Sequence, residues 1–354
     1  MTVNGTTYSS YIYDWTKTPN GTVNQDDYTW QYRSIKVDVS SLKGDTDEAP
    51  MAGGSISLPI GDFGGDPPTL VTGVLGSLLG GTGTPIPSPA FSVMTATWEG
   101  CIEERDTYEI NDYDKLDLDK ALDLDIDLVP DSSDPATQWR PILPQLSYER
   151  EIDEDYVGKF KKTPVNSDKE IFNARMNLWG SDYAPCPSPA RNLASMNKDE
   201  ISDYLDALVA KGNTYHDIGM IWGGRLLSPT GIYAEENEGN GNVSRHLIFL
   251  TDGDTAPNKN SYGTYGIEPL DGRRWDEKSN LSLTETVEER FTVACDQVKS
   301  KNVTVWVIGF GTDVTSMLRD CAGAGHWFQA DDSDELSEAF STIANAVNEL
   351  RITG

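Results

Sequence analysis

The C-terminal half of the chain alternates helical and strand-like hydrophobic patterns. Amphipathic stretches alternate there with short runs that are apolar at every position. Runs without a polar face predict strands buried on both sides, as in a parallel sheet with helices on each face. The pattern predicts a helix from a cap at Asn197 or Asp199 to Gly212, then a helix over 215–228, a strand over 246–251, a helix over 282–302, strands over 303–311 and 326–330, and a helix over 333–351.

The first 190 residues differ from the C-terminal half in composition and in hydrophobic pattern. They are rich in Gly, Pro, Asp, Ser and Thr, with β-leaning runs at 28–40 and 91–104. Residues 64–89 are punctuated by glycine and proline, which predicts a surface loop. We expect residues 1–190 to be an irregular, acidic, β-leaning insertion region and residues 191–354 to be the α/β part.

Charge excludes some partners. The chain has 354 residues, with 28 Lys and Arg against 57 Asp and Glu, for a net charge of −29. Such a field repels nucleic acid and anionic lipid, and attracts cations. No run approaches the ~20 apolar residues of a membrane-spanning helix. Nucleic acid is therefore not expected as a partner.

The carboxylate at the end of the 246–251 run invites a functional interpretation. Ligands of parallel α/β sheets bind beyond the carboxyl ends of the strands. Asp252 follows that run in the stretch TDGD. A buried, unpaired charge is costly, so a metal ion or the amides of the loop would have to stabilise this group if it is buried.

The same residues resemble a known family. TDG after an apolar strand, with GNTYHDIGMIWGGRLLSP before it and VTVWVIGFGT after it, is similar to a von Willebrand factor A-type domain. More narrowly, NLWGSDYAPCPSPARNL and the ending LRITG resemble TadG-type proteins of bacterial Tad/Flp pilus assembly. The resemblance implies a doubly wound, mostly parallel sheet of Rossmann-like type. It also implies a large inserted region and a non-catalytic adhesion or assembly role.

The family holds Mg²⁺ with a DxSxS motif, a threonine and an aspartate. By resemblance, Thr214 matches the threonine and Asp252 the aspartate, while no DxSxS occurs. DVSSL at Asp38 comes nearest, but it has Leu42 in place of the second serine. The opening MTVNG resembles sequence after the family's second strand, so we expect the N-terminal anchor, first strand, first helix and second strand to be missing. The site is then incomplete and binds Mg²⁺, Mn²⁺ or Ca²⁺ only weakly, with a partner's carboxylate as a further ligand.

Competing motifs suggest other functions. Asp123, Asp125 and Asp127 alternate like the first ligands of a calcium loop, but Leu128 stands where that loop needs glycine. The alternation fits instead a strand with one acidic face exposed to solvent, or an amphipathic disordered segment. The spacings SSLK and SMNK lack the partner motifs of acyl-transferring enzymes, and GFGTDV lacks a phosphate-loop lysine.

A hydrolase is the main rival class. Paired carboxylates such as Glu103 with Glu104, or Asp252 with Asp254, could act as general acid and base. Adjacent residues on a strand point to opposite faces, which weakens the first pair. His216 is interpreted as a hydrogen-bonding residue at a helix start rather than as a ligand or base. The acidic first half could also be the functional surface, with the sheet as its scaffold.

The four cysteines have no CxxC spacing, and the three histidines form no HExxH motif, which argues against a zinc site. The resemblance implies an extracytoplasmic location in the bacterial envelope or periplasm, where disulfides persist. Cys295 and Cys321 lie on either side of one strand, so we expect them to pair. Cys101 and Cys186 would then form the second disulfide. A small buried hydrophobic role for Cys295 is the alternative.

Overall fold

The computed structural model describes most of the C-terminal half and parts of the first half. Everything below concerns these residues, and predictions that fall elsewhere, such as the loop at 64–89 and most of DVSSL, lie outside them. The described ranges are 7–17, 28–38, 55–58, 94–98, 100–142, 152–153, 156–160, 186–210, 212–237, 243–259 and 262–350.

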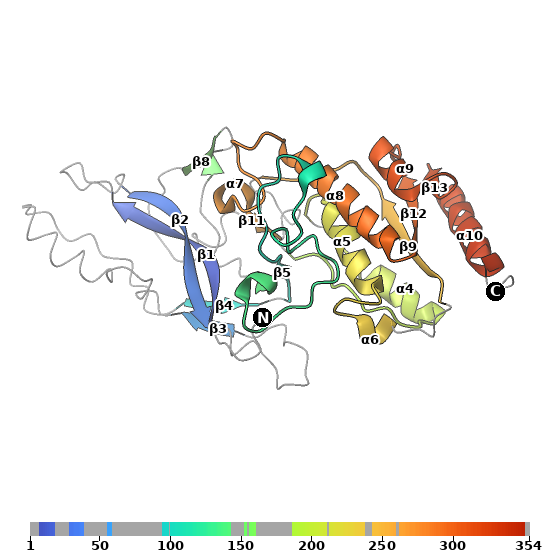
Figure 1. Cartoon of the computed structure of the whole chain (residues 1–354), viewed down its shortest axis with the longest axis horizontal. Coiled ribbons are helices and arrows are strands. Elements are labelled where there is room, and N and C mark those ends of the chain that lie inside the picture. Colours follow the sequence, from blue (N-terminus) through green and yellow to red (C-terminus); the bar gives the residue numbers. More distant parts are fainter. Residues whose placement is uncertain are drawn as a thin grey trace, which may run out of the picture.

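A three-stranded parallel sheet forms the centre of the C-terminal half (Figure 1). It contains β9 (Arg245–Thr251), β12 (Val303–Phe310) and β13 (Trp327–Ala330), in the order β13-β12-β9. β9 and β12 pair in register from Arg245 opposite Val303 to Thr251 opposite Gly309. The runs predicted as buried strands are therefore strands, and the α/β class is confirmed in this coarse form. Burial on both sides holds for β12, whereas Ile248 and Leu250 of β9 are exposed on one face, so that part of the prediction is wrong for β9.

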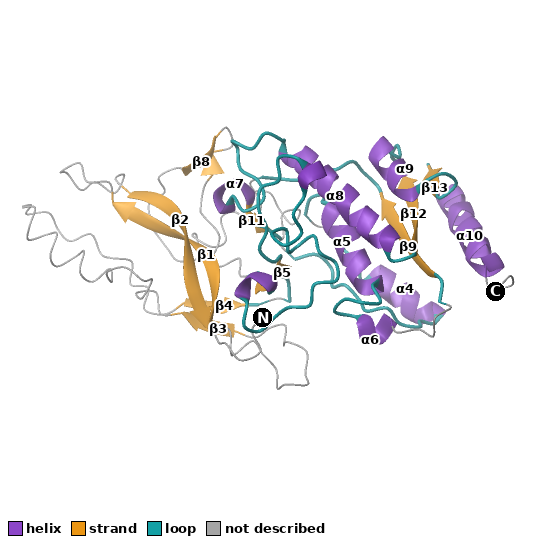
Figure 2. Cartoon of the chain, viewed as in Figure 1, coloured by secondary structure: helices purple, strands orange, loops and turns teal. Residues whose placement is uncertain are grey.

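Helices cover both faces of the sheet. α5 (His216–Leu227) and α8 (Leu283–Ser300) pack side by side on one face, and α10 (Ser333–Leu350) packs on the other (Figures 1 and 2). The first face forms the main core, which includes Met220, Phe291 and Val305. The second face is a smaller cluster built on Trp306 and Ile308 of β12.

Local sequence signals set the helix ends. Ser282 and Glu285 form a capping box at the start of α8, so the Ser and Glu side chains bind free amides of the first turn. Asn197 and Glu200 form another at the start of α4 (Lys198–Asp206). The predicted cap at Asn197 is thus confirmed, although the helix ends at Asp206 rather than at Gly212.

Glycines bring α5 close to its neighbours. A Cβ atom at Gly223 would lie 2.8 Å from Cδ1 of Leu247 in β9. A Cβ atom at Gly224 would lie 2.7 Å from Cγ2 of Val298 in α8 and 3.3 Å from Ile126. The glycine pair therefore allows the α5 backbone to approach β9, α8 and the segment around Ile126.

Residues 101–142 share the main core with the C-terminal half. Ala121, Leu124 and Ile126 are buried in the same cluster as the residues of α5, α8 and β12. Residues 121–127 form turns, and Asp123 is fully buried. The expectation of a strand with a wet acidic face, or of a disordered segment, is therefore wrong, because tertiary packing rather than the local alternation decides which side chains are buried.

The remaining elements are short, except for one hairpin. β1 (Thr7–Lys17) and β2 (Tyr28–Asp38) pair antiparallel, and Asp38 of DVSSL ends β2. The β-leaning runs at 28–40 and 91–104 do contain strands. The other elements are β3 (Ser55–Leu58), β4 (Met94–Thr97), β5 (Ile102–Glu103), η3 (Tyr113–Lys115), η4 (Pro135–Thr137), β6 (Arg140–Pro141), β7 (Ile152–Asp153), β8 (Tyr156–Phe160), α6 (Ala234–Asn237), β10 (Tyr262–Gly263), β11 (Gly266–Ile267), α7 (Glu268–Asp271) and α9 (Ser316–Ala322).

Two disulfides join the cysteines in the pairs that the sequence analysis expects. Cys295 of α8 bonds to Cys321 of α9, with their Cα atoms 5.9 Å apart. Cys101 bonds to Cys186, with a Cα separation of 5.6 Å, and so ties residues 186–210 to the first half. Among the described residues, no helix has the length and apolar character required to cross a membrane.

Candidate functional site at the carboxyl end of the sheet

The structure brings the segments that carry Thr214 and Asp252 together. Thr214 and Ala256 form an isolated antiparallel bridge with backbone N to O distances of 3.3 and 3.1 Å. β9 ends at Thr251, so Asp252 starts the loop that Ala256 ends. Both predicted ligand residues therefore belong to two neighbouring loops at the carboxyl end of the sheet, the place where parallel α/β sheets bind ligands.

His216 fixes the loop that contains Asp252. Its Nε2 atom lies 3.0 Å from Oγ1 of Thr251, and its Nδ1 atom lies 2.9 Å from Oγ1 of Thr255. The imidazole is buried, with edge contacts to Phe249 and Phe291. Burial lowers its pKa below the usual value, against the attraction of Asp254, so the ring is neutral at pH 7. The prediction of a hydrogen-bonding residue at a helix start is confirmed.

The carboxylate of Asp252 is exposed, and no described residue forms a hydrogen bond or ion pair with it. The turn is held instead by Thr251, whose Oγ1 donates to the carbonyl of Gly253 at 2.9 Å. The sequence also allowed Asp252 to accept hydrogen bonds from the backbone amides of its loop. The structure has no such hydrogen bond among the described residues. Asp252 is therefore available to a ligand from outside.

The surroundings of the loop are acidic. Asp254 is exposed, and Glu288 of α8 lies near it. Burial raises the pKa of Glu288, and the charges of Glu285 and Asp254 raise it further. Such an edge attracts cations. Within the described residues, however, no group of three or more His, Cys, Asp or Glu side chains could hold a metal ion.

Thr214 and Asp252 fit a magnesium site in chemistry but not in number. A hydroxyl and a free carboxylate are hard oxygen donors of the kind that Mg²⁺ prefers. Mg²⁺ needs about six oxygens and gives up its waters reluctantly, so two side chains hold it weakly. These two residues, with Mg²⁺, Mn²⁺ or Ca²⁺ as the ion, stay a prediction.

A shallow groove is lined partly by residues that follow this loop in the sequence. Its volume is about 460 Å³, and Trp275 and Leu283 contribute buried apolar surface to it. At its lining, Nζ of Lys259 lies 2.7 Å from Oε1 of Glu277. The full lining is Pro257, Lys259, Trp275, Glu277, Leu283 and Thr284.

The three aspartates considered for calcium have separate partners. Asp123 pairs with Arg290, and Asp127 pairs with Lys301. Asp125 accepts the backbone amides of residues 127 and 128 at 2.9 and 3.1 Å. Their carboxylates are used in three different contacts, so the alternating spacing is not a calcium loop.

The most extensive polar feature is a buried ionic network, which the sequence analysis did not anticipate. It begins with Glu104, which accepts two hydrogen bonds from the guanidinium of Arg225 at 2.6 and 2.9 Å. The indoles of Trp222 and Trp139 also donate to Glu104, at 2.9 and 3.1 Å. Burial acts to raise the pKa of Glu104, but the charge and hydrogen bonds of Arg225, the charge of Arg105 and the Trp139 donor leave it below the usual value.

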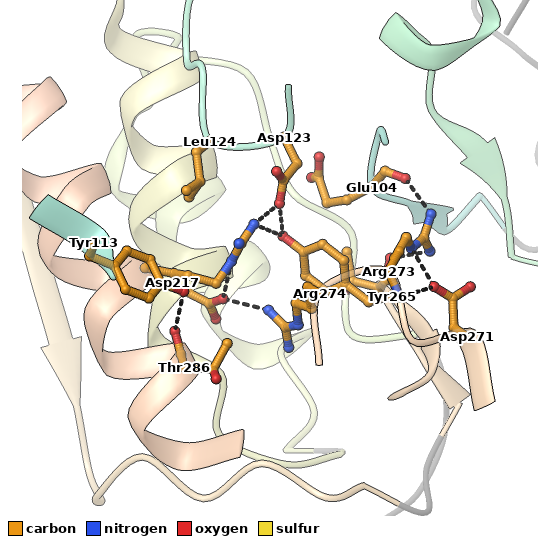
Figure 3. Close-up of polar contacts among 12 residues, drawn as sticks. Glu104, Tyr113, Asp123, Leu124, Asp217, Tyr265, Asp271, Arg273, Arg274 and Thr286 are labelled. Carbon is orange, nitrogen blue, oxygen red and sulfur yellow. Dashed lines mark hydrogen bonds and ion pairs between the residues drawn. The ribbon is translucent and has the colours of Figure 1, made fainter. Parts of the chain in front are cut away.

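A second part of the network crosses the interface between α5 and the 262–275 segment (Figure 3). Arg274 donates to Oδ2 of Asp217 at 2.7 Å and to both carboxylate oxygens of Glu268. Tyr265 donates to Asp123 at 2.5 Å, and Arg290 of α8 pairs with the same carboxylate. The members are Glu103, Glu104, Asp123, Asp217, Tyr265, Glu268, Asp271, Arg225, Arg273, Arg274 and Arg290.

This network holds residues 101–142 against the helices. Glu104 and Asp123 come from that segment, and their arginine partners come from α5 and α8. The side chains of Arg225, Arg290 and Glu104 have no exposed surface. No local sequence pattern predicts this network, because its partners are far apart in the chain: Glu104 and Arg225 are separated by 121 positions.

The pairs considered for hydrolysis are not alike. Glu103 and Glu104 are buried and pair with Arg273 and Arg225, as expected for adjacent residues that point in opposite directions. These ion pairs to arginine occupy both carboxylates. Asp252 and Asp254 are exposed. Glu103 and Glu104 are therefore blocked by arginines, and Asp252 and Asp254 lie on the surface rather than inside the protein. Neither pair forms an interior acid–base pair that is open to a substrate.

Comparison with known proteins gives no further guide. No family model matches the sequence, and no significant match was found among curated proteins or solved structures.

Proposed function

We propose that this chain is a non-catalytic binding module of the von Willebrand A type, from a TadG-like pilus-assembly or envelope protein. It binds a protein partner through a divalent cation held at Thr214 and Asp252. The observation that carries the proposal is the exposed carboxylate of Asp252, which has no partner among the described residues and follows β9 at the carboxyl end of the sheet.

Three features support the family assignment. The sheet is parallel, its helices lie on both faces, and the TDGD loop follows β9 directly. The sequence resemblance runs through the same elements. The two disulfides fit a protein that matures in an oxidising, extracytoplasmic compartment.

The chemistry of the loop favours binding over turnover. His216 is held between two threonines and is neutral, so the nearest imidazole serves the loop rather than a substrate. A cation at Asp252 would keep open positions, and a carboxylate of the partner would occupy one of them. The loop would thus recognise an acidic side chain despite the negative charge of the chain.

Mn²⁺ titration followed by water-proton relaxation tests the proposal. We expect weak binding, with a Kd on the order of millimolar, because the site offers few ligands. Asp252→Asn should abolish it. Asp203→Asn, which removes an exposed carboxylate on α4, is the matched control and should leave it unchanged. Equal binding by the wild type and Asp252→Asn would exclude the site, and substrate turnover lost in Asp252→Asn would exclude the non-catalytic role.

A further inference from the structure

We infer that Asp252 and Gly253 form a modification site, at which the chain rearranges spontaneously to isoaspartate and so loses the free carboxylate at the end of β9. The reaction goes beyond the proposed function, because it needs neither a cation nor a partner. The inference rests on the chemistry of an aspartate followed by a glycine, and on the difference between the two such pairs that the chain contains.

The reaction is an attack within the chain, and the proximity of the two groups makes it unimolecular. The lone pair of the Gly253 backbone nitrogen forms a bond to Cγ of Asp252. The hydroxyl of the side-chain carboxylic acid leaves with the amide hydrogen as water, and the product is a five-membered succinimide. Water then opens the ring at the former main-chain carbonyl, which leaves isoaspartate. One water leaves and one enters, so no oxidant, reductant or other reactant is needed.

The first observation is that the carboxylate of Asp252 is available. It is exposed, and no described residue forms a hydrogen bond or ion pair with it. His216 holds the loop at Thr251 and Thr255, and residues 252–254 lie between these two contacts, outside any helix or strand. Loop backbones move more than helices and strands. The side chain can therefore turn toward the following amide.

The second observation is that the attacking nitrogen is accessible. A Cβ atom at Gly253 would have no neighbour within 4 Å, so the space beside this residue is open. Glycine also has no Cβ atom to obstruct the approach of the carboxyl carbon, and its backbone adopts more conformations than that of other residues. The nitrogen of Gly253 lies 3.4 Å from Oγ1 of Thr251, which is longer than an ordinary N–H to O hydrogen bond.

The second aspartate–glycine pair shows how the fold prevents the same reaction. The side chain of Asp271 is 1% exposed, and its Oδ1 lies 3.0 Å from Nε of Arg273. The backbone amide of Gly272 donates to the carbonyl of Glu268 at 2.9 Å. Both reacting groups are held there, so the reaction at this pair requires local opening of the structure.

The rearrangement also changes the candidate ligand. In isoaspartate the backbone runs through the former side chain, which adds one atom to the loop between Thr251 and Thr255. The free carboxylate is then attached directly to Cα, on an arm that is one carbon shorter. This consequence, unlike the reaction itself, rests on the proposed function. We expect cation binding to fall in proportion to the isoaspartate content at position 252.

Peptide mapping of aged protein tests the reaction. The whole chain is kept for several weeks at neutral pH and physiological temperature, then digested, and isoaspartate is located by electron-transfer fragmentation against a fresh sample. We expect isoaspartate at position 252 to form at least about tenfold faster than at position 271, because the second site must open first. Equal rates at the two positions, or no isoaspartate at position 252, would overturn the inference.

Gly253→Ala isolates the chemistry, because it keeps the carboxylate and places a methyl group beside the attacking nitrogen. Gly253 does not have a positive φ, and its Cβ atom has room, so alanine fits the native backbone. The variant should form isoaspartate at position 252 at least about tenfold more slowly than the wild type. Gly263→Ala, where a Cβ atom also has no neighbour within 4 Å, is the matched control and should age like the wild type. Ageing of Gly253→Ala at the wild-type rate would contradict the inference.

Mn²⁺ titration of the same samples separates the reaction from the proposed function. We expect binding by the wild type to decline during ageing and binding by Gly253→Ala to persist. If fresh protein binds no Mn²⁺ while isoaspartate forms at position 252, the reaction is supported and the proposed cation site is excluded. Full Mn²⁺ binding by protein that carries isoaspartate at this position would overturn the stated consequence for the site.

Discussion

Two acidic regions of this molecule differ in the burial of their carboxylates and in the partners that these carboxylates meet. In the buried ionic network, carboxylates such as Glu104 and Asp217 are inside the protein and meet arginines. At the carboxyl end of β9, Asp252 is exposed and meets no arginine among the described residues. Composition alone cannot separate these groups. Partners and burial do so: the first region holds segments of the fold together, and the second is the one that we propose for ligand binding.

Removal of one arginine should break the network. Arg225→Met leaves Glu104 buried without its cation, which costs about 3–5 kcal/mol of unfolding free energy. Chemical denaturation measures the change. Lys259→Met, which removes the half-exposed partner of Glu277, is the control and should cost less than about 1 kcal/mol. Similar losses in both variants would show that burial does not distinguish these pairs.

The network should also make stability depend on pH. Burial raises the pKa of Asp217 to about 6, Glu268 adds to the shift, and Arg274 opposes it despite the 2.7 Å contact. The folded pKa exceeds the unfolded value, so the native state binds more protons between about pH 4 and 6. The contribution of Asp217 is therefore present at low pH and is lost as the pH rises through 6.

Asp217→Asn tests that sign. The variant should flatten the dependence of unfolding free energy on pH between 4 and 7, by up to about 3 kcal/mol for a shift of this size. Asp271, whose pKa burial also raises to about 6, remains in the variant and keeps part of the slope. An unchanged slope would show that Asp217 is ionised throughout this range.

The sequence predicted what local pattern controls. Continuous apolar runs predicted β9 and β12, and the amphipathic stretch over 282–302 predicted α8. The network could not be predicted, because Asp123 meets Arg290 across 167 positions. The alternating aspartates misled for the same reason. Asp123 meets Arg290 of α8 and Asp127 meets Lys301 just after that helix, and no local spacing contains that information.

A smaller effect is expected where helix and insertion segment meet. Gly224→Ala places a methyl group 2.7 Å from Val298 and 3.3 Å from Ile126. Overpacking of this kind costs about 1–3 kcal/mol, and the better helix propensity of alanine returns up to about 1. We expect a net loss of about 1 kcal/mol in denaturant unfolding. Gly253→Ala, where a Cβ atom has no neighbour within 4 Å, is the control and should be close to neutral.

The smallest effect should come from the residue that the proposed function needs most. Asp252→Asn should change the free energy of unfolding by less than about 0.5 kcal/mol, because the carboxylate is exposed and has no partner among the described residues. Thr251→Val should cost more, about 1–2 kcal/mol, since the Thr251 hydroxyl binds both His216 and the carbonyl of Gly253. Thermal unfolding of the two variants at one pH gives the comparison. A loss at Asp252 as large as that at Thr251 would mean that the carboxylate holds the loop together, and its availability to a cation would no longer follow.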